Sequence, residues 1–390
     1  MRIALIGPAH PYKGGGARHT TELAHRLAAA GHDVVLESWR AQYPALLYPG
    51  RQTVEVPEGE PYPLTRRDLS WRRPDSWLRA GRRLRHADAA VFVFIAPVQV
   101  PPYLGIIRGM RAGAAGGRAR SSRSARKTAA PRTVTICHNV LPHERRPGDE
   151  QLVRALLRRT GAVLTHEERL AADAQRIAPA ATVEVAALPP HFPSVPGAGA
   201  ASSGVVPGGT GGRGPRLLFF GIVRPYKGLD VLLRALAAAP PELTLTVAGE
   251  FWGGTRAAES LVAELGLGDR VRLRPGYVPA DEVGPLLRQA DALVLPYRAA
   301  TASQNVWLAY SHGVPVIATR TGTFPQQVTD GVDGLLCEPG DAADLARALR
   351  RFCRPGERER LRAGAHPVDA DPYWDAYLKA LLSLAAPARS

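Results

Sequence analysis

The chain alternates between short, almost wholly apolar runs and longer segments whose apolar residues recur every three to four positions. Runs such as 2–7, 89–95 and 291–295 are typical of strands that are buried on both faces of a parallel sheet. The intervening segments, for example 17–30 and 229–239, place leucine and alanine on one helical face. This regular exchange of strand and helix predicts doubly wound α/β architecture.

Two series of these elements follow one another along the chain. The first has strands at 2–7, 33–37, 89–95, 133–137, 161–165 and 182–186, and helices at 17–30, 101–110, 149–159 and 167–177. The second has strands at 216–221, 243–249, 270–273, 291–295 and 315–318, and helices at 229–239, 256–266, 280–289, 303–312 and 341–353. No element is assigned to 43–84, where arginine, proline and tryptophan are frequent.

The predicted domain boundaries follow the composition. Residues 1–193 form a first domain, and the glycine-, proline- and alanine-rich stretch 194–215 has the composition of a flexible linker. Residues 216–371 form a second domain, and residues 372–390 contain a last amphipathic helix with Asp371 as its expected N-cap. A chain of 390 residues is too long for one ordinary core and fits two domains.

The chain is strongly basic. Its net charge is +15, which favours anionic partners such as phosphates, acidic lipid surfaces or nucleic acid. Residues 111–132 combine glycine, alanine and serine with seven cations, so disorder is expected there. This segment has no aromatic residue for base stacking, which disfavours specific nucleic-acid binding and favours contact with an anionic membrane. A loop insertion without function is the alternative.

Cysteine content and hydropathy favour a cytoplasmic protein, and the basic segment 111–132 adds peripheral contact with the inner membrane face as one option. The three cysteines are odd in number and lack metal-site spacing, as in reducing compartments. No apolar run reaches the ~18 residues of a membrane-spanning helix. The apolar start at 2–7 is expected to be a first strand and not a signal peptide.

Glycines lie at the first turn between strand and helix, where a backbone can approach an anion closely. Gly14-x-Gly16-x-x-His19 resembles a dinucleotide-binding motif, with Glu37 as the acid for the ribose. The third glycine is missing and the loop is too long, so a nicotinamide enzyme is disfavoured.

Two cations occupy a second strand–helix turn, Gly221-Ile-Val-Arg-Pro-Tyr-Lys-Gly228. Arg224 and Lys227 follow the apolar run 217–220 and precede an amphipathic helix. Free backbone N–H groups and the positive end of the helix dipole point at this turn. The planar guanidinium of Arg224 can bind two phosphate oxygens at once, and the Lys227 ammonium adds a compact positive charge, so together they suit a diphosphate. A solvated loop with incidental charges is the alternative.

This loop resembles the diphosphate-binding loop of retaining glycosyltransferases of family 4, which have the GT-B fold. A second block, 296–341, is similar to the donor-binding region of the same family. It contains Ser303, the run Gly313-Val-Pro-Val-Ile-Ala-Thr319 and the run Asp330-Gly-Val-Asp-Gly-Leu-Leu336. Both blocks occur in the family's order, and the resemblance extends over nearly the whole chain.

The resemblance implies two Rossmann-like, doubly wound domains that face each other across a cleft, with the last helix crossing back to the first domain. It implies a metal-independent, hexosyltransferase-like enzyme that transfers a sugar from a nucleotide diphosphate sugar to an acceptor: a glycan, a lipid-linked compound or a small molecule. No cofactor is expected. The implied donor-site residues are Gly15, Gly16, Arg224, Lys227, Ser303 and Gln304 at the diphosphate, and Gly249, Tyr277 and Val278 at the nucleotide base and ribose.

A histidine is the candidate catalytic residue. His138 directly follows the apolar run 133–137, at the carboxyl end of a predicted strand, where ligands of open α/β sheets bind. An imidazole at that place suits acid–base work or a sugar-hydroxyl contact. The family has a histidine against the donor sugar at the end of this strand, and His138 matches it. A structural histidine is the alternative.

The sequence also departs from the family. Two glutamates that many members carry in the second block are replaced by Ala300 and Leu308, and Ile222 stands where an arginine often follows the first loop glycine. These departures leave two alternatives to a transferase: a non-catalytic GT-B module that binds a partner or a membrane, and a GT-B epimerase of the nucleotide sugar.

One carboxylate pair mimics a metal motif. Asp369-Ala370-Asp371 has the spacing of the metal-binding motif in the other glycosyltransferase fold. Its position before the last helix favours helix capping. No metal is therefore expected.

Overall fold

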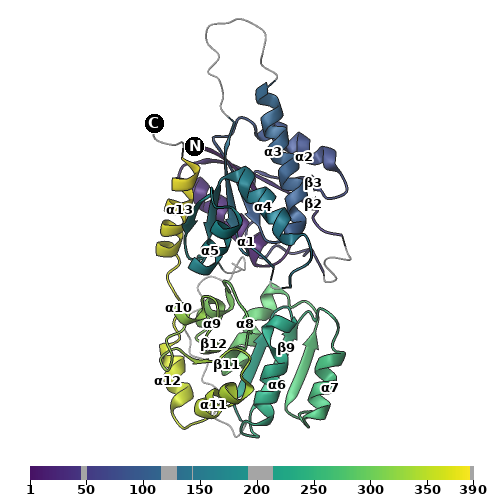
Figure 1. Ribbon diagram of the computed structural model, residues 1–390. Helices are drawn as coiled ribbons and strands as arrows, with labels where there is room; N and C mark the ends of the chain where they lie inside the picture. The colour runs from purple at the N-terminus through teal and green to yellow at the C-terminus, as the bar shows by residue number, and fades with distance from the viewer. Residues whose placement is uncertain (45–50, 116–129, 143, 192–213, 387–390) are drawn as a thin grey trace, which may run out of the picture. The chain divides into compact units, whose positions relative to one another are not determined.

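The structure, a computed structural model, describes residues 1–44, 51–115, 130–142, 144–191 and 214–386. Its contacts divide the chain into two compact units. Unit 1 comprises Met1–His191 together with Ala370–Ser390, and unit 2 comprises Phe192–Asp369. Each unit contains one parallel β-sheet with helices on both faces (Figure 1).

The sheet of unit 1 has seven strands in the order β3-β2-β1-β4-β5-β6-β7. All pairings are parallel, as the continuous apolar runs predict. The strands are β1 (Arg2–Ile6), β2 (Asp33–Ala41), β3 (Thr65–Ser70), β4 (Ala89–Phe94), β5 (Arg132–Cys137), β6 (Ala162–Thr165) and β7 (Thr182–Val185).

Alternate residues of these strands enter two separate cores. Ile6, Phe92 and Phe94 lie in one apolar cluster, which includes buried side chains of α2, α3, α4 and α5. Leu5 and Val93 lie in the other, with buried side chains of α1 and α13. The helices are α1 (Gly15–Ala29), α2 (Pro74–Leu84), α3 (Val100–Ala115), which follows the 3₁₀ turn η2 (Pro97–Gln99), α4 (Asp149–Thr160), α5 (Glu168–Ile177) and α13 (Asp371–Ala385).

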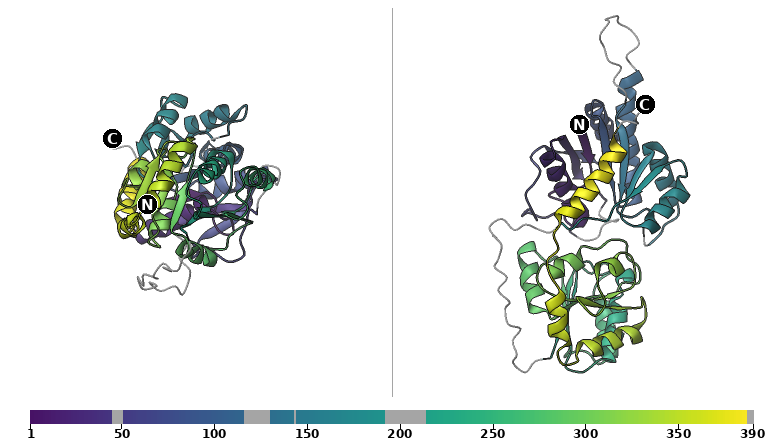
Figure 2. Two further views of the ribbon diagram at one scale, coloured as in Figure 1. Left: turned by 90° about the horizontal axis from the view of Figure 1, so that it is seen from below. Right: turned by 90° about the vertical axis from the view of Figure 1, so that its left-hand side faces the viewer.

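The last helix returns to unit 1, as the resemblance implies. Figure 2 shows α13 lying along unit 1 in its right-hand view. Trp374 and Tyr377 are fully buried there, and the Trp374 indole donates to the Pro190 carbonyl at 3.1 Å. The prediction that Asp371 is the N-cap of this helix is wrong, because Ala370 occupies that position and its side chain makes no capping hydrogen bond. Asp371 is the first residue of α13 and accepts a hydrogen bond of 2.6 Å from Arg26 of α1.

The sheet of unit 2 has six parallel strands in the order β10-β9-β8-β11-β12-β13. They are β8 (Arg216–Phe220), β9 (Thr244–Gly249), β10 (Val271–Pro275), β11 (Ala292–Leu295), β12 (Val316–Thr319) and β13 (Gly334–Cys337). One core lies between this sheet and leucines of α6 and α11. The helical segments are η3 (Pro225–Lys227), α6 (Leu229–Ala237), α7 (Arg256–Glu264), α8 (Ala280–Gln289), α9 (Asn305–Tyr310), α10 (Phe324–Gln327), α11 (Ala342–Phe352) and α12 (Glu357–Gly364).

Some predicted boundaries are wrong. The unassigned stretch 43–84 contains β3 and α2. The segment 111–132 was expected to be disordered throughout, but Arg111–Ala115 continue α3 and Arg132 begins β5. Residues 116–129 lie outside the described residues, as does most of the predicted linker 194–215.

Replacement of Trp374 tests how much the last helix contributes to unit 1. Trp374→Ala removes a fully buried indole and should lower the free energy of unfolding by ~3–5 kcal/mol. Urea denaturation followed by fluorescence or circular dichroism measures this change. The exposed Lys379 on the same helix supplies the control, since Lys379→Ala should change stability by less than ~0.5 kcal/mol. Equal effects of the two substitutions would contradict the packing role of α13.

Candidate functional site

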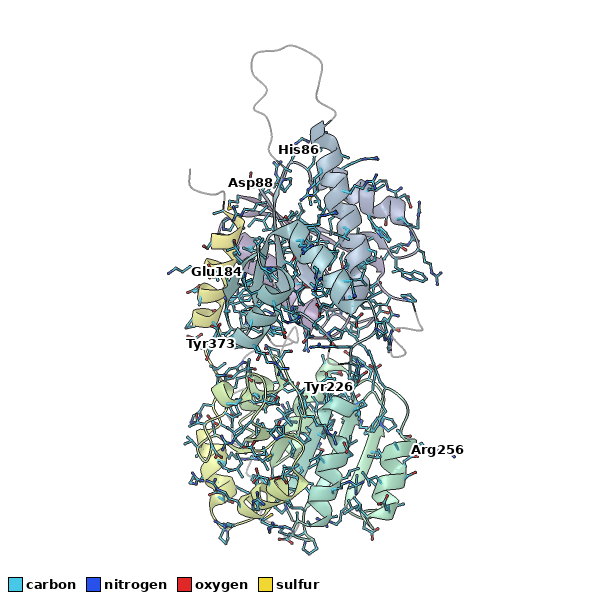
Figure 3. The ribbon with its side chains drawn as sticks, viewed as in Figure 1. His86, Asp88, Glu184, Tyr226, Arg256 and Tyr373 are labelled. Atoms are coloured by element: carbon cyan, nitrogen blue, oxygen red, sulfur yellow. The ribbon has the colours of Figure 1, made fainter. Side chains whose placement is uncertain are left out.

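The two loops that carry the sequence motifs of unit 2 meet at the carboxyl ends of the neighbouring strands β8 and β11. The strand order changes direction between β8 and β11, and crevices at such a switch point bind ligands in open α/β sheets. The Gly221–Gly228 loop follows β8, and residues 296–304 follow β11. The backbone N–H of Arg298 donates to the Tyr226 carbonyl at 2.7 Å, which joins the loops directly. Figure 3 marks Tyr226 within this loop.

Backbone packing requires glycine at one position of the loop and at one position beside it. A Cβ atom at Gly228, whose φ is +68°, would lie 2.1 Å from the Pro296 carbonyl oxygen. A Cβ atom at Gly249, at the end of β9, would lie 1.9 Å from the Gly221 carbonyl oxygen. Because neither approach tolerates a side chain, both glycines hold the ends of β8, β9 and β11 together. The predicted site residue Gly249 is thus part of the wall beside the loop.

An ion pair that the sequence did not reveal fixes the same loop. The Arg298 guanidinium donates to both carboxylate oxygens of Asp230, at 2.7 and 2.5 Å, and to the Pro225 carbonyl at 3.0 Å. The hydrogen bond from Arg298 holds the pKa of Asp230 below its ordinary value. Both side chains are partly exposed, so the pair's effect is chiefly to fix geometry.

Lys227 lies at the inner side of the loop, beside an aromatic ring. Its Nζ atom is 5.0 Å from the centre of the Tyr297 ring, and a Cβ atom at Gly221 would lie 3.4 Å from it. Burial lowers the pKa of Lys227, and the neighbouring Arg224 lowers it further. In the part of the chain that the structure describes, no carboxylate lies within ion-pair distance of this ammonium. An anionic ligand would relieve the repulsion between these two cations.

Arg224 is oriented by aromatic stacking. Its guanidinium carbon lies 4.7 Å from the centre of the Trp252 ring and 5.9 Å from that of Tyr226. Trp252 follows β9, and its backbone N–H donates to the Val223 carbonyl at 3.2 Å. The stacked guanidinium is therefore held in a defined plane, which favours planar recognition of an anion.

Ser303 and Gln304 precede a helix that is shorter than predicted. The expected helix 303–312 is α9 (Asn305–Tyr310), and Gln304 is its N-cap residue without a side-chain capping bond. The Ser303 hydroxyl instead accepts from the Asn305 backbone N–H at 3.3 Å. The Asn305 amide donates to the Phe220 carbonyl at 3.3 Å, which places the start of α9 beside the end of β8.

The residues predicted to contact the nucleotide base and ribose lie near the carboxyl ends of β9 and β10 in the same sheet. Tyr277 and Val278 follow β10, and Gly276 before them donates its N–H to the Gly249 carbonyl at 3.0 Å. Val278 is buried, and Tyr277 is half-buried. Ala300 and Leu308, the positions that lack the family's glutamates, are both buried, at 5% and 7% exposure. Apolar side chains at these places provide no carboxylate for a ribose.

In unit 1, the glycine turn begins α1. Gly14 has φ of +93°, and Gly15 is the first helical residue. A Cβ atom at Gly16 would lie 2.3 Å from the Ile95 side chain, so the first turn packs directly on the end of β4. Glu37 is buried and bound to Arg83 at 2.8 Å, which removes it as the ribose acid of a dinucleotide site.

His138 belongs to a histidine cluster formed by His19, His138, His166 and His191. The His138 ring centre lies 4.9 Å from those of His19 and His166, and His19 lies 5.5 Å from His191. The His138 Nε2 atom is buried, although the residue as a whole is partly exposed. No local sequence pattern brings the other three together, because they come from α1 and from segments after β6 and β7.

The cluster also contacts the glycine turn. The Nε2 atom of His191 lies 3.2 Å from the Gly15 carbonyl oxygen, and its Nδ1 atom lies 2.9 Å from the Pro189 carbonyl oxygen. Trp374 stacks on His19 at 5.8 Å, and Tyr377 stacks on His166 at 5.8 Å. The last helix therefore packs against two members of the histidine cluster, His19 and His166.

Burial keeps these imidazoles neutral. It lowers the pKa of His166 and of His191 to about 4, and those of His19 and His138 well below 6.5, with repulsion between the rings adding to the effect for His19 and His138. A neutral imidazole can accept or donate a hydrogen bond to a sugar hydroxyl at neutral pH. Among the described residues, no group of three or more histidine, cysteine or acidic side chains has the geometry of a metal site.

Part of unit 2 matches the model of a known protein family. Residues 214–354 match the model of the family described as glycosyl transferases group 1. These residues of unit 2 are therefore similar to that family. The matched residues contain both the Gly221–Gly228 loop and the second block, so the resemblance found in the sequence is confirmed.

Curated relatives match over part of their length. The D-inositol 3-phosphate glycosyltransferase of Thermomonospora curvata is 35% identical over 180 residues, which cover 43% of this chain and 42% of that protein. The protein of the same name from Streptosporangium roseum is 36% identical over 172 residues, 41% of this chain and 39% of that one. The chain thus spans about two fifths of the length of these relatives.

Solved structures match over nearly the whole chain. Sucrose-phosphate synthase from Thermosynechococcus elongatus has a TM-score of 0.64 at 19% identity, covering 99% of this chain and 100% of that one. HepE from Anabaena, solved in complex with UDP, has a TM-score of 0.68 at 15% identity, covering 98% and 100%. The predicted fold class, two Rossmann-like units of the GT-B type, is confirmed. Within the described residues, no helix is long and apolar enough to cross a membrane.

The histidine cluster should make folding acid-sensitive. The folded imidazoles have pKa values below the ordinary 6.5, so the unfolded chain binds more protons between about pH 4 and 6.5. The free energy of unfolding should therefore have its full value above pH 6.5, and it should decrease as the pH drops from 6.5 to about 4. Each histidine contributes a slope of ~1.4 kcal/mol per pH unit.

Urea denaturation at a series of pH values measures that slope. His166→Gln should reduce it by ~1.4 kcal/mol per pH unit, whereas the same change at the exposed His86 should not. An unchanged slope in His166→Gln would show that the cluster does not govern the acid response.

Proposed function

We propose that this chain is a metal-independent glycosyltransferase that binds a nucleotide diphosphate sugar through unit 2 and transfers the sugar to an acceptor. The observation that carries this proposal is the pair of Arg224 and Lys227 on a loop that glycine contacts and Arg298 hold at the switch point of the sheet. The family match of residues 214–354 and the names of the relatives support it. UDP, bound in the HepE structure, is the first nucleotide to test.

The cations of the loop act on the leaving group. Arg224 and Lys227 bind the diphosphate, and their charge stabilises the negative charge that develops as the glycosidic bond to the phosphate oxygen breaks. Ser303 and Gln304 lie beside the same loop and contact the distal phosphate. The backbone at Gly249, Tyr277 and Val278 surrounds the base and ribose, where the family's ribose carboxylate is absent.

The transfer is proposed to retain the configuration of the sugar. The acceptor hydroxyl oxygen forms a bond to the anomeric carbon, the bond from that carbon to the diphosphate breaks, and the hydroxyl proton passes to the departing phosphate oxygen. This balance requires no protein nucleophile. Neutral His138 contacts a sugar hydroxyl, and Gly15 and Gly16 provide close backbone approach to the donor.

The buried apolar Ala300 and Leu308 favour a second candidate, a GT-B module that has lost catalysis. A thermal-shift panel with UDP, GDP, ADP and TDP, followed by assays with the sugar nucleotide of whichever base binds, separates the candidates. Transfer or slow hydrolysis of the donor supports the enzyme. Failure of all four nucleotides to bind would contradict the proposed function.

Lys227 should determine affinity for the nucleotide diphosphate. Lys227→Ala removes a charged hydrogen-bond donor worth ~1.5–3 kcal/mol, which corresponds to a ~10- to 150-fold rise in the Kd of UDP. Isothermal titration calorimetry measures the Kd, and circular dichroism checks the fold. Arg256→Ala, at the start of α7 and labelled in Figure 3, removes an exposed cation of the same unit and should leave the Kd unchanged. A wild-type Kd in Lys227→Ala would place the diphosphate elsewhere.

His138 should affect turnover more than nucleotide binding. Loss of a contact that strengthens in the transition state lowers kcat more than it raises KM. We expect His138→Ala to reduce kcat by ~10²-fold or more with a nearly unchanged Kd for UDP. His86→Ala is the control. Normal kcat in a folded His138→Ala variant would leave this residue with a structural role only.

A further inference from the structure

A groove on unit 1 takes no part in the proposed function. It lies between α2 and α3, encloses about 500 Å³ and is lined by Trp77, Leu78 and Leu104 along its length. Three arginines complete its lining: Arg108 and Arg111 from α3, and Arg159 from the end of α4. Figure 1 shows α2 and α3 side by side in unit 1.

Glycine packing makes the groove a fixed feature of the fold. A Cβ atom at Gly81 of α2 would lie 2.1 Å from the Ile106 carbonyl, and one at Gly109 of α3 would lie 2.5 Å from the Leu78 carbonyl. The two helices therefore cross in direct backbone contact. Beside the crossing, Trp77 covers Gly105, where an added Cβ would lie 3.0 Å from the Trp77 Cβ. The Trp77 indole donates to the Ser70 carbonyl at 2.8 Å, which fixes the ring.

The charge around the groove has one sign. All three arginines are exposed, and the Arg111 guanidinium donates to the Arg159 carbonyl at 3.1 Å. Within the described part of the chain, none of the three forms a salt bridge, and no acidic side chain lines the groove. The sequence of α3 contains no acidic residue, and residues 116–129, which follow it, contain five cations and no carboxylate.

We propose that this groove docks unit 1 on an anionic membrane by taking one phospholipid. The lipid phosphate binds Arg108, Arg111 and Arg159, and the adjoining part of an acyl chain lies along Trp77, Leu78 and Leu104. An apolar trough with a cationic border complements a molecule that has both an anionic head and a hydrocarbon chain. Such a trough offers nucleic-acid bases few polar partners, which favours a lipid over RNA. This inference does not depend on the proposed transferase activity.

Vesicle binding of the full chain tests the charged part of the groove. The protein is sedimented with phosphatidylcholine vesicles that contain about one third phosphatidylglycerol, or none. The triple variant Arg108→Gln/Arg111→Gln/Arg159→Gln should bind the anionic vesicles ~10- to 100-fold more weakly than wild type. The control triple variant Arg234→Gln/Arg256→Gln/Arg354→Gln makes the same charge change at exposed positions of unit 2 and should bind as wild type does.

Two outcomes of this experiment overturn the proposal. Equal weakening by both triple variants would show that net charge alone drives binding. Wild-type binding by the groove variant, with its fold verified by circular dichroism, would show that other basic residues hold the membrane. Fluorescent RNA is titrated in parallel, and loss of RNA affinity without loss of vesicle affinity in the groove variant would also contradict a lipid site.

Tryptophan quenching tests the apolar part. Vesicles whose acyl chains carry bromine quench indoles that contact hydrocarbon. Wild-type protein should be quenched on binding, Trp77→Phe should lose most of this quenching while it still binds, and Trp71→Phe should retain it. Undiminished quenching in Trp77→Phe would show that no acyl chain reaches the groove.

Discussion

The bond between Arg298 and Asp230 is the contact on which the unit 2 site depends most. It joins residues 68 positions apart and lets one guanidinium bind a carboxylate and the Pro225 carbonyl of the Gly221–Gly228 loop. Partial exposure limits its contribution to stability, since water and salt screen such pairs. Its consequence is geometric: with the Arg298 N–H bound to Tyr226, the loop after β8 cannot move independently of the loop after β11.

Two cations lie close together on this rigid loop, and among the residues that the structure describes no carboxylate lies within ion-pair distance of Lys227. Stacking on Trp252 orients Arg224, and the Tyr297 ring lies under Lys227. The glycines at 228 and 249 bring the surrounding backbone within contact distance. A preorganised cationic loop of this kind does not have to reorganise when an anion binds or when charge develops on it.

The predicted catalytic residue of unit 1, His138, lies among neutral side chains, in contrast to the cationic loop of unit 2. Three of the four rings in the histidine cluster of unit 1 are buried, and burial lowers the pKa of each histidine in the group, which keeps the rings neutral at neutral pH. Neutral rings under the cover of Trp374 and Tyr377 suit hydroxyl groups better than phosphates. This difference in charge supports the proposed assignment of sugar contacts to unit 1 and diphosphate contacts to unit 2.

The sequence predicted the fold class and most strands, because parallel strands buried on both faces are continuous apolar runs that periodicity detects. It failed at α2, whose buried side combines Leu84 with the small residues Ser76, Ala80 and Gly81 and therefore lacks the run of leucines that marks a helix such as α6. It also placed the start of α9 too early. Arg298 and the three further histidines escaped notice because their contacts join residues far apart in the chain, which no local pattern reveals.

A crystal structure of the protein with UDP tests the central claim most directly. Our account predicts the diphosphate within hydrogen-bond distance of the Lys227 ammonium and the Arg224 guanidinium, with the Arg298–Asp230 bond intact. A diphosphate bound away from the Gly221–Gly228 loop, or a loop that releases Arg298 when UDP binds, would contradict it.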